Sequence, residues 1–173
     1  MKKILLLLVT LIGGFLYTAM AAGLTLTSTA FAPNQTIPLI FTCEGRDKTP
    51  DLSWSDIPKG TASFVLIMED LDAPGGIWVH WVMFNIPATV QQWQTNTLNI
   101  PAGTLIGKNS WGEANYRGPC PPPGKDHHYV FTLYALDRFL DLPTGATAPE
   151  IQDAIKDHIL GQAQLIGIYR RSV

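Results

Sequence analysis

Two aspartates and a histidine lie on either side of a tight turn in the middle of the sequence. Asp70 and Asp72 come just before a Pro-Gly-Gly stretch, and His80 follows within an aromatic run. Residues two apart in an extended chain point to the same face, so the two carboxylates would repel each other unless nearby groups donate to them. An aspartate before Pro-Gly-Gly is also ordinary turn chemistry, so the pattern indicates either a turn or a site.

A second strand-like run also begins with histidines. His80 alternates with Val82 and Phe84 on one face of its predicted strand, where a lone histidine is more often a core residue than a ligand. His127 and His128 open another aromatic and β-branched run after a proline-rich loop. We therefore expect two histidine-bearing strand starts and the aspartate pair to meet at one edge of a sheet.

Several chemistries fit such a cluster, and the sequence favours one without a metal. No H-E-x-x-H motif is present, so the sequence predicts no metal site and no cofactor. Ser110 does not form a nucleophile elbow, because Gly107 precedes it by three residues rather than two. Imidazole N–H groups, a tyrosine hydroxyl and turn amides can hold a phosphate or a carboxylate. A histidine acting as general base on water remains the alternative.

The remaining sequence predicts a small β domain that would position these residues. The chain has 173 residues and a formal charge of −2, which gives no basic field for nucleic-acid binding. A capping box of Thr147 and Glu150 predicts one helix over 148–160, ended by Gly161. Strands are predicted over 24–28, 36–41, 63–69, 78–86, 128–136 and 163–170. Many short strands with Pro- and Gly-rich connections indicate a mainly β, antiparallel β-sandwich in a single domain, residues 22–173.

The first 21 residues have the pattern of a secretory signal peptide. Two lysines are followed by an apolar run and by Ala19-Met20-Ala21. A retained transmembrane anchor is the alternative, since the apolar run is long enough to span a bilayer. We expect cleavage, a periplasmic or secreted protein, and no stable membrane span afterwards. In an oxidising compartment Cys43 and Cys120 are expected to form a disulfide; two free buried cysteines are the alternative.

Two segments carry a resemblance to a known family. Residues 69–87 read EDLDAPGGIWVHWVMFNIP, and residues 116–137 read YRGPCPPPGKDHHYVFTLYALD. Together they resemble the phosphatidylethanolamine-binding proteins, which include Raf kinase inhibitor protein. The upstream residues 39–70 resemble the exported bacterial members. The resemblance implies a central β-sandwich with one or two short peripheral helices. Leu71 and His128 stand where the family often has proline and arginine.

The resemblance also implies a small anion pocket and a set of residues around it. Carried over by position, the ligand-binding residues are Asp70, Asp72, His80, Pro122, His127 and Tyr129. We expect the rings of His80 and His127 to donate to the anion while the two aspartates orient them. The expected function is a secreted, small-anion-binding protein, an inhibitor or regulator rather than an enzyme. The alternative is a hydrolase, and a third reading is a protein-interaction module with residues 108–118 as its contact loop.

Overall fold

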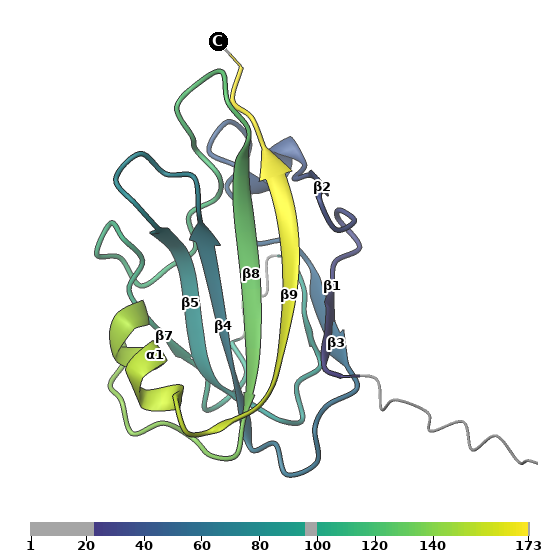
Figure 1. Ribbon diagram of the computed structural model, residues 1–173, viewed down its shortest axis with the longest axis vertical. Helices are drawn as coiled ribbons and strands as arrows, with labels where there is room; N and C mark the ends of the chain where they lie inside the picture. Colours follow the sequence, from purple (N-terminus) through teal and green to yellow (C-terminus); the bar gives the residue numbers. More distant parts are fainter. Residues whose placement is uncertain (1–22, 96–99, 173) are drawn as a thin grey trace, which may run out of the picture.

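The described residues of the protein fold into two β-sheets, a helix and a short 3₁₀ helix (Figure 1). The computed structural model describes residues 23–95 and 100–172, so the predicted signal segment lies outside the described residues. The larger sheet has the strand order β2-β9-β8-β4-β5-β7, and the smaller one the order β1-β3-β6. The strands are β1 (Thr25–Thr27), β2 (Gln35–Thr36), β3 (Leu52–Ser55), β4 (Ser63–Asp70), β5 (Trp78–Pro87), β6 (Gln92–Trp93), β7 (Leu105–Ile106), β8 (His127–Leu136) and β9 (Ile159–Tyr169).

The large sheet separates two hydrophobic cores. Its centre, β4, is apolar on both faces, and successive side chains alternate between them. Phe64, Leu66 and Met68 pack in the core between the two sheets, whereas Val65 and Ile67 pack in the core under α1 (Ala148–Ile155). All strand pairs are antiparallel except β2 with β9. The predicted mainly β sandwich is therefore confirmed.

The helix begins as predicted but ends earlier. Thr147 and Glu150 form the capping box, and the helix ends at Ile155 instead of 160. Ile159 and Gly161, expected in and just after the helix, belong to β9, where they pair with Leu136 and Ala135 of β8. The long antiparallel ladder with β8 outweighs the helical four-residue spacing of Ile151, Ile155 and Ile159, because tertiary pairing overrides local propensity.

The predicted strand over 36–41 is wrong over most of its length. Only Thr36 remains in β2, and Leu39–Phe41 form a 3₁₀ helix, η1. Pro38 has a φ of −60° and has no N–H to give to a strand ladder, while its carbonyl accepts from the N–H of Phe41 at 3.0 Å. In the described part of the chain, α1 and η1 are both too short to cross a lipid bilayer.

Candidate functional site

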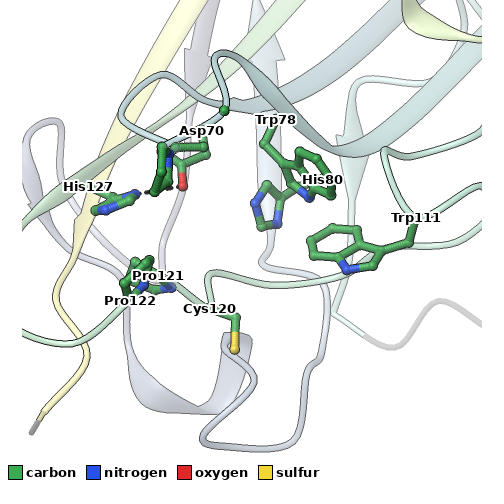
Figure 2. Close-up of a pocket in the computed structure, with 11 residues that line it drawn as sticks. Asp70, Trp78, His80, Trp111, Cys120, Pro121, Pro122 and His127 are labelled. Atoms are coloured by element: carbon green, nitrogen blue, oxygen red, sulfur yellow. Dashed lines mark hydrogen bonds and ion pairs between the residues drawn. The ribbon is translucent and has the colours of Figure 1, made fainter.

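The described part of the chain forms a pocket at the end of the sandwich where β4 ends and β8 begins (Figure 2). The cavity has a volume of about 260 Å³. Its walls come from the β4–β5 turn, the start of β5, the start of β8 and the loop before β8. The lining residues are Asp70, Ala73, Pro74, Gly75, Trp78, His80, Trp111, Cys120, Pro121, Pro122 and His127.

Strand pairing brings the ionisable side chains to one face of the large sheet. Asp70 is paired with Trp78 of β5 on one side and with Tyr129 of β8 on the other, so the three side chains share a face. His127 lies two residues before Tyr129 and therefore points the same way. This face is the one that packs against the small sheet further along the strands. The pocket is thus the open end of the space between the sheets.

A β-bulge turns His80 into this pocket. Met68 pairs with Trp81 and Glu69 with Val79, so His80 is an extra residue of β5 with no partner on β4. Simple alternation would put His80 on the face of Val82, which packs under α1. The expected shared face of His80 with Val82 and Phe84 is therefore wrong, because the extra residue re-aims the ring.

Asp70 and His127 form a buried pair inside the pocket. Each is 4% exposed. Nδ1 of His127 lies 2.8 Å from Oδ2 of Asp70, and Oδ1 of Asp70 accepts the backbone N–H of Asp72 at 2.9 Å. Both carboxylate oxygens are therefore occupied by hydrogen bonds from the chain, which holds the carboxylate and the ring in a single orientation.

His80 is held by a backbone carbonyl instead of an aspartate. Its Nδ1 lies 2.7 Å from the carbonyl oxygen of Arg117. Burial has the largest effect on the pKa of this ring and lowers it. The Arg117 carbonyl and the Asp70 carboxylate raise the pKa, but by less, so the net shift is downward. The ring also makes edge-on contacts with Trp111 and Tyr129, at centroid distances of 5.1 and 5.2 Å. His80 is thus a neutral, tightly packed ring at neutral pH.

The structure brings most of the expected site residues together but places two elsewhere. Asp70, His80, Pro122 and His127 line the cavity. Asp72 lies at the surface, where its Oδ2 accepts from the backbone N–H and Nδ1 of His128 at 2.7 Å each. His128 holds the pKa of the Asp72 carboxyl below its usual value. Asp72 therefore orients neither pocket histidine.

Tyr129 lies behind the pocket wall. Its ring is fully buried against His80. Burial raises the pKa of its phenol, and the neighbouring Asp70 carboxylate adds to the rise. Its hydroxyl is buried and makes no hydrogen bond of good geometry within the described residues. Tyr129 thus supports the His80 ring from the core side.

The wall opposite β4 is anchored by a disulfide. Cys43 and Cys120 are bonded, with a Cα–Cα distance of 5.4 Å, which confirms the predicted bridge. The backbone N–H of Cys43 also donates to the carbonyl of Pro119 at 3.1 Å. Figure 2 shows Cys120, Pro121 and Pro122 below the Asp70–His127 pair. The bridge therefore fastens this wall to the loop that follows η1.

Two tryptophans form the apolar side of the pocket. Trp78 and Trp111 meet edge to face at a centroid distance of 5.4 Å, and they are 36% and 38% exposed. Trp81, the next tryptophan along β5, is instead buried in the inter-sheet core against Trp93 and Tyr116. The bulge explains the difference, because it leaves His80 and not Trp81 at the cavity.

The loop that carries Trp111 contains positioning residues that the sequence did not reveal. Asn109 is 5% exposed, and its Oδ1 accepts the backbone N–H groups of Trp111 and Glu113 at 3.0 Å each. Ser110 accepts the N–H of Val79 at 2.8 Å and so fastens the loop to β5. An asparagine or serine in a loop carries no sequence signal that separates this role from ordinary turn chemistry.

The comparisons with known proteins agree with the fold. A family model described as phosphatidylethanolamine-binding protein matches residues 27–170. The chain belongs to this family.

Relatives with sequence and structural similarity span most of the chain. A protein named UPF0098 protein, from Methanothermobacter thermautotrophicus, is 45% identical over 145 residues, covering 82% of this chain and 95% of its own. A Mycobacterium tuberculosis protein that carries the lipoprotein name LppC is 42% identical over 150 residues, 86% of this chain and 73% of its own.

Two solved structures share the fold. The crystal structure of CT736 from Chlamydia trachomatis, described as a phosphatidylethanolamine-binding protein homologue, has a TM-score of 0.82 and 36% identity, covering 87% of this chain and 99% of its own. Escherichia coli YBCL, described as a new member of the mammalian family, has a TM-score of 0.82 and 30% identity, covering 87% and 100%.

Proposed function

We propose that this protein binds a small ligand bearing a phosphoryl or carboxyl group, with the ligand lying between His80 and His127. The observation that carries the proposal is the convergence of two imidazole rings from distant segments on one cavity. At about 260 Å³ the cavity is smaller than the roughly 300–1,000 Å³ of pockets for drug-sized ligands. It would therefore accept a head group and not a whole large molecule. The family name, which refers to binding of a phosphate-containing lipid, supports the same ligand chemistry.

We also propose that the protein acts outside the cytoplasm. The Cys43–Cys120 disulfide supports this location, because disulfides persist in oxidising compartments. A relative that carries a lipoprotein name supports it as well. The predicted signal peptide over residues 1–21 would deliver the chain there.

Calorimetric titration with inorganic phosphate and with phosphoethanolamine tests the binding proposal. We expect His80→Ala and His127→Ala each to weaken binding by about tenfold or more, a loss of about 1.4 kcal/mol. His128→Ala is the matched control: it removes a histidine from the same strand start, but one that pairs with Asp72 at the surface. Equal affinity in the wild type and both pocket variants would contradict the assignment.

A hydrolase is the second candidate, and the Asp70–His127 pair favours it. A carboxylate that accepts from Nδ1 orients an imidazole so that Nε2 can take a proton from water. Turnover of an ester, amide or phosphoester that depends on both residues would support this function. Absence of turnover across such a panel, together with retained phosphate binding, would count against it.

A further inference from the structure

Both pocket histidines have one ring nitrogen committed to an acceptor. Nδ1 of His80 lies 2.7 Å from the Arg117 carbonyl oxygen, and Nδ1 of His127 lies 2.8 Å from Oδ2 of Asp70. Carbonyl and carboxylate oxygens only accept hydrogen bonds, so each Nδ1 must carry the hydrogen. A neutral imidazole has one N–H group, and its other nitrogen is then an acceptor. In their neutral forms both rings therefore present an Nε2 lone pair to a ligand.

The pocket-lining residues that the structure describes supply no positive side chain that would offset the two Nε2 lone pairs. Among the described residues that line the pocket there is no lysine or arginine, and Asp70 is the one carboxylate. Asp70, Tyr129 and the more distant Asp47 face His80, besides the Arg117 backbone. Burial keeps His80 neutral by lowering its pKa. A fully ionised oxyanion would thus meet a negative charge and two lone pairs.

His127 has a similar surrounding. Asp70 accepts from it, Tyr169 of β9 lies across from it in the ladder, and Asp126 precedes it in the chain. Asp126 is exposed and is paired with Arg170 at 2.8 Å, so it does not supply a free charge to the pocket. On this side of the pocket, a ligand therefore meets the hydrogen-bonded pair of the His127 ring and the Asp70 carboxylate.

We propose that the pocket selects oxyanions that carry their own proton, such as a phosphomonoester monoanion or dihydrogen phosphate, and rejects fully ionised anions of the same shape, such as sulfate. This inference rests on the proposed function and names the ligand class for the same site.

Hydrogen bonding and protonation explain the selection. A P–OH group donates to an Nε2 lone pair. Inorganic phosphate keeps such a group at neutral pH in both its singly and doubly charged forms, whereas a phosphomonoester, with a second pKa of about 6, keeps one mainly below that pH. Sulfate has no hydrogen to donate, so its oxygens would leave the buried acceptors unpaired and would repel Asp70. We expect the resulting discrimination to be about ten- to a hundredfold in affinity.

The substitution Asp70→Asn should move the ring hydrogen of neutral His127 from Nδ1 to Nε2, so that the ring donates to a ligand instead of accepting from it. Oδ1 of Asp70 accepts the N–H of Asp72, so in Asp70→Asn the amide oxygen stays at that position and the amide nitrogen replaces Oδ2. The new N–H would donate to Nδ1 of His127, which moves the ring hydrogen to Nε2. The variant would then offer a donor to sulfate and would lack the repelling carboxylate. Asp72→Asn, which changes a surface acid outside the lining, is the matched control.

Calorimetric titration of the full exported protein with phosphate and with sulfate, at neutral pH and matched ionic strength, tests the inference. We expect phosphate to bind at least about tenfold more tightly, Asp70→Asn to gain sulfate affinity, and Asp72→Asn to behave as the wild type. Equal affinities for the two anions in the wild type would overturn the inference and leave the proposed function standing. Binding of neither anion would overturn both.

Nitrogen-15 NMR of the histidine rings gives a second test that needs no ligand. In the free wild-type protein we expect the neutral form of both rings, His80 and His127, to carry its hydrogen on Nδ1. An Nε2–H form of either ring would overturn the inference even if phosphate binds. The same spectra of Asp70→Asn should show His127 converted to the Nε2–H form, and an unchanged His127 would also count against it.

Discussion

Removal of the Cys43–Cys120 bridge should cost a large part of the stability of this protein. The two cysteines are separated by 77 residues. In the chain-entropy model, closing a loop in the unfolded chain stabilises by about 3 kcal/mol for 15 residues and about 4.7 kcal/mol for 100. A separation of 77 residues therefore corresponds to about 4.5 kcal/mol. Because the free energy of unfolding of a typical protein is only about 5–15 kcal/mol, the bridge would supply a large fraction of it.

Urea denaturation of the wild type and of the double variant Cys43→Ala/Cys120→Ala measures the effect. With a slope of about 2 kcal/mol per molar urea, the midpoint should fall by about 2 M. Wild-type protein treated with a phosphine reductant should unfold near the midpoint of the double variant, since both lack the same cross-link. A shift below about 0.5 M in both samples would refute the loop-closure reasoning.

Three further results are expected. Thr147→Ala should lower the free energy of unfolding by about 1 kcal/mol, measured by urea denaturation, because it removes the N-cap of α1; an unchanged midpoint would contradict this. Burial lowers the pKa of His80, so the unfolded chain binds more protons below about pH 6.5 and stability falls with acid; His80→Gln should flatten that fall, and an identical pH profile would argue against a buried neutral ring. The intact mass of the protein purified from its own cells should correspond to a chain that begins at Ala22, and a mass that includes residues 1–21 would show a retained segment.

Much of the fold could be predicted because the strongest signals are local and periodic. The apolar and aromatic runs of β4, β5 and β8 begin and end within a residue or so of their predicted positions. The helix start could be predicted from Thr147 and Glu150, because the side chain of each residue accepts the backbone N–H of the other. The helix end was not, because the pairing of Ile159 with Leu136 is a long-range contact that isoleucine spacing cannot reveal.

The site was predictable in its residue types but not in its hydrogen bonds. Asp70 and His127 meet because β4 and β8 are neighbours, which the sequence does not state but the resemblance implies. Asp70 and Asp72 were both expected to orient the pocket histidines. The chain turns after Asp70, however, so Asp72 lies at the surface and pairs with His128. The partner of His80 is the backbone carbonyl of Arg117, in the loop between β7 and β8, and no residue type marks a loop carbonyl as the acceptor for a distant side chain.

The unpaired position of His80 in β5 has a consequence at the level of the gene. Its neighbours Val79 and Trp81 already alternate correctly between the two cores, since they pair with Glu69 and Met68. Loss of a single codon here would remove one ring from the cavity and restore regular β4–β5 pairing at this bulge, while the second irregularity of this pair, between Phe64 and Leu66, would remain. The ring lining of this cavity could therefore change in one mutational step that leaves Val79 and Trp81 on their present faces.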